Sequence, residues 1–559
     1  MRRFFSGQLP LQQNRGKRLN LFRSCVKLKP YMPGKEGQAM GNNRIRKRAA
    51  IIFGGAAYEL FASFGWQAQH LAESRPLMGL FAAALLAVPA CAVLRLLLAA
   101  SERHAKDMVF EEKFSAWRAF AAILVCYVPM FAVTFPGSFS YDVPFQLEQV
   151  FTGSYSSHHP LLHTLLLGGC VYLGQSLGSI NLGAALYTAL QMTGLAACFA
   201  ASCASIARQA GARAAKWSAF FFALYPLHMC MAVNATKDVL FGGLFVLTLA
   251  LARETMAAQE ASARRDAGLV LAAAGMMLLR NNALYAVIAF IAVILIILRG
   301  RALRMAGVMV LAVCLCTAGN AAIKRATNAA EGDLCEMLSW PIQQLARARN
   351  LHGDVMTAEE LAAIDTLMPA KSWRLYDKTI SDPVKFEFDT QAFLSDPGKY
   401  VRVYLSLGGR CPKAYFDALL YHTYSFWYPY SEYGVSGYYL QMGISDSFYE
   451  WCDFERISSQ SLMPRVLASL SWRFGAQGAM QIPVVGCAFN MGVIVWVMLY
   501  FALREWYLGR WTGLAAAALP VLLWGTFLLG PVMAGRYIYP FVCCLPVMVC
   551  HTRKIIRRN

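Results

Sequence analysis

The sequence is poor in charge, and acidic residues are its scarcest charged class, with 32 Asp and Glu against 52 Lys and Arg in 559 residues. Charged residues make up 15% of the chain and hydrophobic residues 57%. That composition is too apolar for a soluble protein and is typical of a polytopic membrane protein. The chain also lacks P-loop, GxGxxG and HExxH motifs, so the usual signatures of ATP-driven transport and of zinc-peptidase chemistry are missing.

Two further absences narrow the possibilities. The first 48 residues contain no apolar core followed by a small-residue cleavage site, so no cleavable signal peptide is expected. The 16 cysteines form no CxxC or Cys/His zinc spacing, and most of them lie in apolar stretches, where they behave as small hydrophobic residues. Only Cys335, Cys411 and Cys452 fall in the large polar region, residues 324–476, which allows at most one internal disulfide there.

Long apolar segments dominate the rest of the chain. A helix needs about 20 apolar residues to cross the hydrocarbon core, and the pattern predicts roughly twelve spans. They are expected at 49–66, 76–100, 117–135, 180–206, 216–233, 239–252, 267–280, 283–298, 303–323, 479–503, 511–533 and 536–551. The resulting division is a basic segment 1–48, a transmembrane region 49–323, a polar domain 324–476, C-terminal transmembrane helices 477–552 and a basic tail 553–559.

The formal net charge of +20 reflects basic residues beside apolar segments. Because no nucleic-acid recognition fold accompanies them, they indicate cytoplasmic anchoring by the positive-inside rule and not a nucleic-acid partner. The rule also decides segment 159–178, which is apolar enough to be counted as a span. If this segment lies in the outer leaflet as a juxtamembrane helix, every later basic loop becomes cytoplasmic. The prediction is a multi-pass protein of the cell membrane with both termini in the cytoplasm.

The same topology places residues 324–476 outside the cell. This region holds 18 of the 32 acids and is long enough for a small, mainly α-helical domain with its own core. Helices are expected at 342–349, 357–366 and 415–424, with prolines between them. The aromatic run between 421 and 439 is interpreted as a membrane-interface belt, with a sugar-stacking surface as the alternative.

Charged groups predicted at the outer membrane face are the candidate site residues. The acids are Asp142 and Glu148 in the first large loop, 136–178, and Asp238 at the start of a span. The cations are Lys237, Arg280 and Arg536, and an unpaired Arg beside lipid costs at least a few kcal/mol. Phosphate is a natural counter-ion for guanidinium. The alternative is that these cations pair structurally with Asp142 and Asp238.

Histidines near the first loop raise the question of a metal. His159 and His163 are four residues apart and would share one helix face. However, Pro160 begins the helix there and no nearby acid supplies the remaining ligands, so metal ligation by His158, His159 and His163 is not favoured.

The order of these motifs resembles the GT-C superfamily of membrane glycosyltransferases. Five features carry the resemblance: Ser140-Tyr141-Asp142, His158-His159-Pro160-Leu161-Leu162, Lys237-Asp238, Arg280-Asn281-Asn282, and Arg536-Tyr537 followed by Pro540. The resemblance covers most of residues 117–551, and the segment from Ser339 to Arg347 also looks like that of a poorly characterised bacterial branch. It implies a GT-C-like bundle with outer juxtamembrane helices and one inserted extracytoplasmic domain.

The resemblance also implies an activity, the transfer of sugar from a polyprenyl-phosphate donor, usually with inversion, to an envelope glycan, lipid or protein at the outer face. Asp142 would be the general base, and Asp238 a second acid that positions the acceptor, a cation or Lys237. Lys237, Arg280, Arg536 and Tyr537 would bind the donor phosphate. The remaining residues expected to line the site are Tyr141, Gln146, Glu148, His158 and His159. Metal use varies in the superfamily, so a divalent cation, Mg²⁺ or Mn²⁺, at Asp142 and Asp238 is left open.

Three other functions compete with transfer. A lipid-linked sugar flippase would also want cationic groups inside a helix bundle, but distributed along a cavity open to both sides. A surface-polysaccharide polymerase or ligase would lack the early acid and the His-Pro motif. A non-catalytic receptor or assembly factor is the third alternative.

Overall fold

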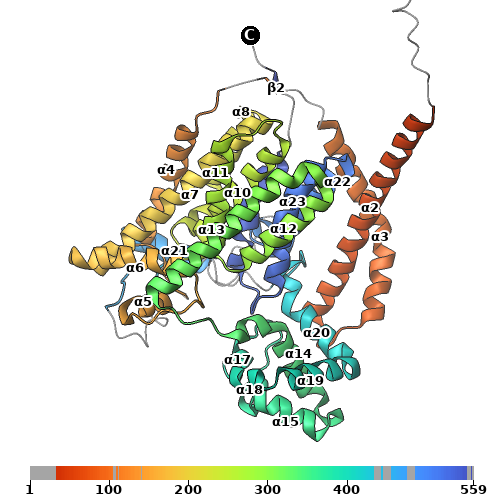
Figure 1. The fold of residues 1–559 in the computed structure, drawn as a ribbon, viewed down its shortest axis with the longest axis vertical. Helices are drawn as coiled ribbons and strands as arrows, with labels where there is room; N and C mark the ends of the chain where they lie inside the picture. The colour runs from red at the N-terminus through yellow and green to blue at the C-terminus, as the bar shows by residue number, and fades with distance from the viewer. Residues whose placement is uncertain are drawn as a thin grey trace, which may run out of the picture. The chain divides into compact units, whose positions relative to one another are not determined.

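The structure of the protein is a computed structural model that describes residues 33–104, 109–110, 113–139, 142–432, 442–444, 455–474, 485–550 and 555–556. Within these ranges the regular elements are helices, apart from the two-residue strands β1 (Val109–Phe110) and β2 (Ile555–Ile556), which pair in parallel (Figure 1). Three residues named above, Ser140, Tyr141 and Cys452, lie outside the described residues.

Eight helical segments in the described part of the chain are long and apolar enough to cross a membrane. They are Asn42–His70, Pro76–Arg103, Ala116–Thr134, Ile180–Ala210, Lys237–Ala257, Asn282–Thr327, Met491–Leu508 and Trp511–Leu528. The segment Asn282–Thr327 has 46 residues and comprises two helices, α12 (Asn282–Leu298) and α13 (Leu303–Thr327), joined by a 3₁₀ turn. The predicted class, an all-α polytopic membrane protein, is confirmed, whereas the count of about twelve spans stays a prediction.

Besides α12 and α13, the helices of this part are α2 (Pro33–His70), α3 (Pro76–His104), α4 (Ala116–Thr134), α5 (Asp142–Thr152), α6 (Leu161–Ser176), α7 (Ile180–Ala210), α8 (Ala212–Leu224), α9 (Pro226–Ala232), α10 (Lys237–Ala257), α11 (Ala263–Leu279), α21 (Pro464–Phe474), α22 (Met491–Leu508), α23 (Trp511–Leu528) and α24 (Tyr539–Val549). Helix α10 forms the centre of the bundle and packs against α7, α11, α23 and α24. In its most apolar stretch 72% of the residues are buried, against 11% for α3. Asp238 at the start of α10 and Arg253 near its end are both buried.

Two predicted spans have different boundaries in the structure. The stretch 216–233 is divided into α8 and α9 at Tyr225, whose extended backbone is the conformation expected before Pro226. The stretch predicted at 479–503 contains α22, which begins only at Met491, where the Asn490 side chain caps the helix by accepting from Val493 N–H. Residues 475–484 lie outside the described part of the chain.

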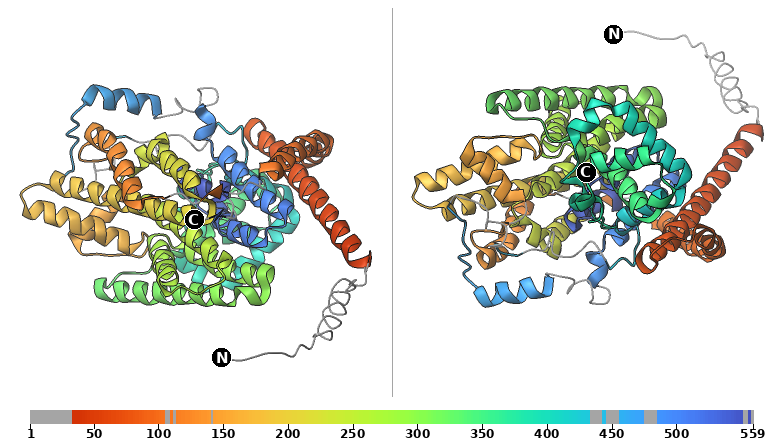
Figure 2. Two further views of the ribbon diagram at one scale, coloured as in Figure 1. Left: turned by 90° about the horizontal axis from the view of Figure 1, so that it is seen from above. Right: turned by 90° about the horizontal axis from the view of Figure 1, so that it is seen from below.

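Segment 159–178 forms the short helix α6, which runs back against α7 (Figures 1 and 2). Its 16 residues are fewer than the roughly 20 needed for a crossing. A tight turn at Gly178, with φ of 90°, reverses the chain. The two helices touch at Gly174 and Gly183, where a Cβ on Gly174 would lie 2.1 Å from the backbone nitrogen of Gly183.

The polar region contains a bundle of short helices, here called the helical insert, residues 334–426. Figure 1 shows most of its helices together in green to cyan. They are α14 (Ser339–His352), α15 (Ala358–Leu367), α16 (Ala370–Trp373), α17 (Asp382–Lys385), α18 (Thr390–Ser395), α19 (Pro397–Arg410) and α20 (Pro412–Thr423), with 3₁₀ helices at Leu334–Leu338, Gly353–Val355 and Tyr424–Phe426. Its hydrophobic core is separate from that of the membrane bundle and includes Cys335 and Cys411 as free thiols.

The helices predicted in this region are present as α14, α15 and α20. Helix α15 begins with a capping box between Thr357 and Glu360. Pro383, Pro397 and Pro412 stand in the first turn of α17, α19 and α20. These prolines start helices, because the missing N–H would be unsatisfied there in any case.

The helical insert holds the loop between α23 and α24. Trp340 Nε1 donates to Leu528 O at 2.6 Å, and His422 Nε2 lies 2.8 Å from Gly530 O. The backbone N–H of Ser381 donates to Pro531 O at 2.9 Å, and its hydroxyl donates to the same oxygen at 3.0 Å. These contacts fix the loop that leads directly to Arg536.

The aromatic run differs from both sequence interpretations where the structure describes it. Tyr421, Tyr424, Phe426, Trp427 and Tyr428 are buried and belong to the main hydrophobic core. Trp427, for example, packs its ring 5.1 Å from that of Phe61 in α2 and accepts a hydrogen bond on its carbonyl from Trp496 Nε1 in α22. For these five residues, both the membrane-interface belt and the sugar-stacking surface are wrong, because protein covers their rings.

Candidate functional site

Two loops far apart in the sequence are joined beside the site. Ser138 N–H donates to Val233 O at 2.8 Å, and Ala235 N–H returns a bond to Ser138 O at 2.8 Å. The approach is close: Gly137 has φ of 141°, and a Cβ there would lie 2.3 Å from Thr188 Oγ1. This pairing brings the start of α5, with Asp142, next to the start of α10, with Lys237 and Asp238.

A series of buried, hydrogen-bonded side chains links α5 to the loop before α10. Gln146 in α5 contacts His163 Nδ1 at 3.1 Å, and His163 Nε2 lies 2.6 Å from Tyr187 Oη. Tyr187 donates to Gln191, whose amide donates to the carbonyls of Ala232 and Asn234 at 3.0 and 2.9 Å. Gln146 was predicted to line the site, but in the structure it is fully buried in this chain and acts as scaffold.

Asp142 is held by two cations from different elements. Its Oδ2 lies 2.7 Å from Lys237 Nζ in the first turn of α10. Arg536, in the 3₁₀ turn Gly535–Ile538 before α24, approaches both carboxylate oxygens at 3.3 Å. Three of the candidate site residues from the sequence are therefore in direct contact in the structure.

Asp238 lies behind this first pair and is fully buried. Its carboxylate forms an ion pair with Arg280, the residue that ends α11, and lies 3.6 Å from Arg536 Nε. Thr236 caps α10 by accepting from Asp238 N–H. A carboxylate in the first turn of a helix is also stabilised by the helix dipole.

Arg280 is also held between aromatic rings. Its guanidinium carbon lies 4.4 Å from the ring centroid of Tyr537 and 4.5 Å from that of Phe527. Nε donates to Asn282 Oδ1 at 3.1 Å, and Asn282 in turn donates to Thr526 at 2.9 Å. Stacking and hydrogen bonding together fix the plane of the guanidinium at the site.

His158 and His159 connect the site to the helical insert. His159 Nδ1 lies 3.4 Å from Lys237 Nζ, and its ring meets that of His158 edge-on at 4.6 Å. His158 Nδ1 lies 3.8 Å from Glu336 Oε1 in the insert. Burial and the charge of Lys237 hold the pKa of His159 well below its ordinary value, so the ring is neutral near pH 7.

Most of the charged groups of the site line one cavity of about 1160 Å³. Eight of the predicted site residues line it: Asp142, Glu148, His158, His159, Lys237, Arg280, Arg536 and Tyr537. Asp238 lies behind the lining and reaches the cavity through Arg280 and Arg536. A cavity of this size is large enough for a drug-sized ligand and more.

The structural alternative for the cations is confirmed, since Lys237, Arg280 and Arg536 do pair with Asp142 and Asp238. Pairing alone leaves a surplus, because three cations face two carboxylates. Burial by itself raises the pKa of the Asp142 carboxyl, but the positive charges of Arg536 and Lys237 outweigh it, and the pKa lies well below its ordinary value. These five side chains, here called the cavity floor, therefore carry one positive charge in excess. Glu148 of α5 also lines the cavity, as an exposed side chain outside this cluster.

A divalent cation does not fit these residues. Both carboxylates already face cations, and a metal ion between them would stand beside three further positive charges. Among the described residues, no group of three or more His, Cys, Asp or Glu side chains has the arrangement of a metal site.

The sequence did not point to the part of the cavity lining that comes from the helical insert. The helical insert contributes Glu336, Ile380, Asp382, Lys385 and Phe386 to the cavity lining. Nothing in the spacing of Glu336 and Asp382 distinguishes them from the other acids of that polar region. They can be recognised only in the structure, where the insert contacts the loop after α23.

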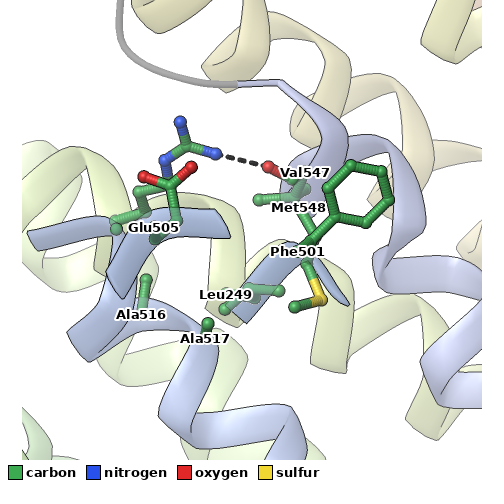
Figure 3. Close-up of a pocket in the computed structure, with 9 residues that line it drawn as sticks. Leu249, Phe501, Glu505, Ala516, Ala517, Val547 and Met548 are labelled. Atoms are coloured by element: carbon green, nitrogen blue, oxygen red, sulfur yellow. Dashed lines mark hydrogen bonds between the residues drawn. The ribbon is translucent and has the colours of Figure 1, made fainter. Parts of the chain in front are cut away.

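A second, much smaller cavity of about 20 Å³ lies near the far end of α10 (Figure 3). It is lined by Leu249, Phe501, Glu505, Ala516, Ala517, Val547 and Met548, among others. Arg253 donates there to the carbonyls of Val547 and Cys550 at the end of α24. The last carbonyls of a helix have no donor within the helix, so this contact caps the C-terminus of α24.

Comparison with known proteins gives one match. A family model described as a family of unknown function, DUF6020, matches residues 152–559, which is more than half of the chain. The matched region includes Lys237, Arg280 and Arg536 and begins ten residues after Asp142. No curated protein and no solved structure matches the chain.

Proposed function

This chain belongs to DUF6020, a family of unknown function, and we propose that it is a membrane glycosyltransferase of GT-C type. It moves a sugar from a polyprenyl-phosphate carrier to a glycan, lipid or protein of the cell envelope at the extracytoplasmic face. One observation carries the proposal: the Asp142 carboxylate shares a cavity of about 1160 Å³ with Lys237, Arg280 and Arg536. An acid among surplus cations is what transfer from a lipid phosphate requires.

The chemistry assigns each group a part. The acceptor hydroxyl oxygen forms a bond to the anomeric carbon of the sugar as the bond from that carbon to the phosphate oxygen breaks. The bonding electrons stay with the phosphate, which changes from a monoanionic diester to a dianionic monoester, and Asp142 receives the hydroxyl proton. Lys237, Arg280 and Arg536 stabilise the second negative charge as it develops on the phosphate.

The observed ion pairs suggest an order of events. In the structure Lys237 and Arg536 pair with the carboxylate of Asp142 and keep its pKa low, so Asp142 is a weak base in this state. A donor phosphate needs these same cations. When it binds, it draws positive charge away from Asp142 and raises the basicity of the carboxylate, so the donor binds before the acceptor is deprotonated.

The proposed topology has about twelve spans, cytoplasmic termini and an extracytoplasmic cavity. The pairing of β1 with β2 supports one part of it, because it brings residues 109–110 beside residues 555–556. Both segments were predicted to be cytoplasmic from their basic neighbours. The site is then at the opposite end of α10 from Arg253, about 24 Å away for 16 residues of helix.

The first test is binding of the lipid phosphate itself. The purified protein in lipid nanodiscs is titrated with undecaprenyl phosphate and followed by native mass spectrometry. Wild type is expected to bind, and Arg536→Ala and Arg280→Ala to lose at least tenfold in affinity. Arg208→Ala is the matched control, because Arg208 forms a surface pair with Glu254 away from the cavity.

The second test is turnover. Mass spectrometry compares envelope glycans and lipid-linked sugars between a deletion strain and a strain complemented with wild type. Accumulation of a polyprenyl-phosphate sugar together with loss of one sugar from an envelope component supports transfer. Accumulation of the lipid-linked sugar on the cytoplasmic leaflet alone would instead identify a flippase. Unchanged glycans and unchanged lipid carriers would reject both.

A further inference from the structure

The cavity lining has two parts of opposite charge. The floor, which consists of Asp142, Lys237, Asp238, Arg280 and Arg536, carries one positive charge in excess. The helical insert adds a second part, here called the insert wall, with Glu336 and Asp382 around a single cation, Lys385. Lys385 Nζ lies 2.8 Å from Glu336 Oε2 and 2.7 Å from Asp382 Oδ1. Two carboxylates around one ammonium leave this wall with one negative charge in excess.

The three charged side chains of this wall differ in their exposed fraction. The side chain of Lys385 is 5% exposed, whereas those of Glu336 and Asp382 are 30% and 29% exposed. The ammonium is therefore largely shielded from solvent, whereas both carboxylate side chains are partly exposed and line the cavity. Glu148, also exposed at the cavity, adds another negative charge. Besides Lys385, the basic side chain near Glu336 is His158, whose Nδ1 lies 3.8 Å from Glu336 Oε1.

The rest of this wall suits a hydroxylated ligand. Phe386, directly after Lys385, lines the cavity with its ring 79% exposed. An exposed ring beside carboxylates allows a sugar to lay its C–H face on the aromatic surface while its hydroxyls donate to the acids. The cavity lining also includes Gln149, Ser154 and Asn281, which are uncharged hydrogen-bonding groups.

From this arrangement we infer that Glu336 and Asp382 set the charge class of the acceptor: the protein accepts a neutral or amine-bearing glycan and rejects a polyanionic one. The inference rests on the proposed function, because it assigns the floor to the donor phosphate and the insert wall to the acceptor. A bound donor cancels the surplus positive charge of the floor. The acceptor then meets only the negative wall, which repels uronic acids and phosphate polymers.

The test uses three hexasaccharides that differ mainly in charge. They are hexa-glucosamine, maltohexaose and hexa-galacturonate, titrated by calorimetry at pH 7 and low salt into the full-length protein in nanodiscs that contain undecaprenyl phosphate. Hexa-glucosamine or maltohexaose is expected to bind at least tenfold more tightly than hexa-galacturonate. The variant Glu336→Gln/Asp382→Asn should reduce this preference to threefold or less.

A variant that leaves Lys385 buried without partners could fail to fold. The triple variant Lys385→Met/Glu336→Gln/Asp382→Asn removes the cation as well and makes the same prediction. Glu387→Gln is the matched control, because Glu387 follows Phe386 but pairs with Lys371 and does not line the cavity. It should keep the wild-type preference.

The outcomes separate this inference from the proposed function. Binding of undecaprenyl phosphate, measured in the same nanodiscs, should stay within twofold of wild type in the wall variants. Failure of wild type to bind the lipid phosphate rejects the proposed function, whatever the glycans do. If hexa-galacturonate binds as tightly as the others, if none of the three binds at millimolar concentration, or if the wall variants keep the preference, the acceptor assignment is wrong.

Discussion

Ser381 of the helical insert binds Pro531 twice: its backbone N–H and its hydroxyl both donate to the carbonyl oxygen of Pro531, at 2.9 and 3.0 Å. Pro531 lies five residues before Arg536, in the loop between α23 and α24. The insert therefore does more than contribute residues to the cavity lining. It fixes the backbone that carries one of the three cations on the cavity floor.

The first prediction concerns this contact. Ser381→Ala removes the hydroxyl bond and keeps the backbone bond, a loss of about 1 kcal/mol, or about fivefold in an equilibrium constant. We expect a twofold to fivefold weaker affinity for undecaprenyl phosphate in nanodisc titrations, because Arg536 is held less firmly. Ser395→Ala, at an exposed end of α18, should leave the affinity unchanged. Equal affinities for both variants would contradict a positioning role.

Asp142→Asn separates catalysis from binding. Without a carboxylate to take the proton, sugar transfer from a polyprenyl-phosphate donor should fall at least a hundredfold. Donor binding should tighten or stay the same, because Lys237 and Arg536 no longer pair with a carboxylate that competes with the donor phosphate. Single-turnover transfer and lipid titration measure the two effects. Transfer at the wild-type rate would reject Asp142 as the base.

The pH dependence of transfer follows from the cations around Asp142. Their charge holds its pKa well below the ordinary value, so the carboxylate is ionised across the neutral range and wild-type transfer should lose activity only in strong acid. Lys237→Gln removes one positive charge, which raises this pKa and moves the acid limb of kcat/KM to higher pH. The donor is a phosphodiester and does not titrate there. A limb that stays in place or moves to lower pH would contradict the assignment.

The charged residues of the candidate site could be singled out from the sequence because charge is rare in this chain. An Asp, Lys or Arg at the end of an apolar span is costly, so Asp142, Lys237, Arg280 and Arg536 could be recognised one by one. Their contacts depend on the loop pairing at Ser138 and Ala235, which no periodicity reveals. Gln146 was assigned to the lining because it follows Asp142, yet the turn of α5 directs it to His163.

The cavity-lining residues of the helical insert could not be recognised from the sequence, because charged residues are common in that region. Its helices α14, α15 and α20 follow from ordinary capping and apolar spacing, and they are present. Within a region rich in acids, however, Glu336 and Asp382 differ from the others only through Lys385 and the loop after α23. The aromatic residues from Tyr421 to Tyr428 were predicted to lie at a surface, which is wrong because α2 and α22 cover them. Both outcomes depend on contacts between distant segments.

The last prediction concerns the stability of the floor. Asp238 is fully buried and paired with Arg280, and removal of one partner of a buried pair leaves an uncompensated charge that costs about 3–5 kcal/mol. Asp238→Ala should therefore lower the apparent Tm in detergent by several degrees. Asp266→Ala breaks the more exposed pair with Arg304 and should change the Tm much less.

A double variant separates charge compensation from packing. Asp238→Ala/Arg280→Met removes both charges of the buried pair and should recover a substantial part of the lost Tm, although it should not restore binding of the lipid phosphate. If the double variant is less stable than Asp238→Ala alone, the contribution of Arg280 lies in its stacking between Phe527 and Tyr537, and the ion pair is secondary. If Asp238→Ala has the wild-type Tm, the buried pair does not stabilise the floor at all.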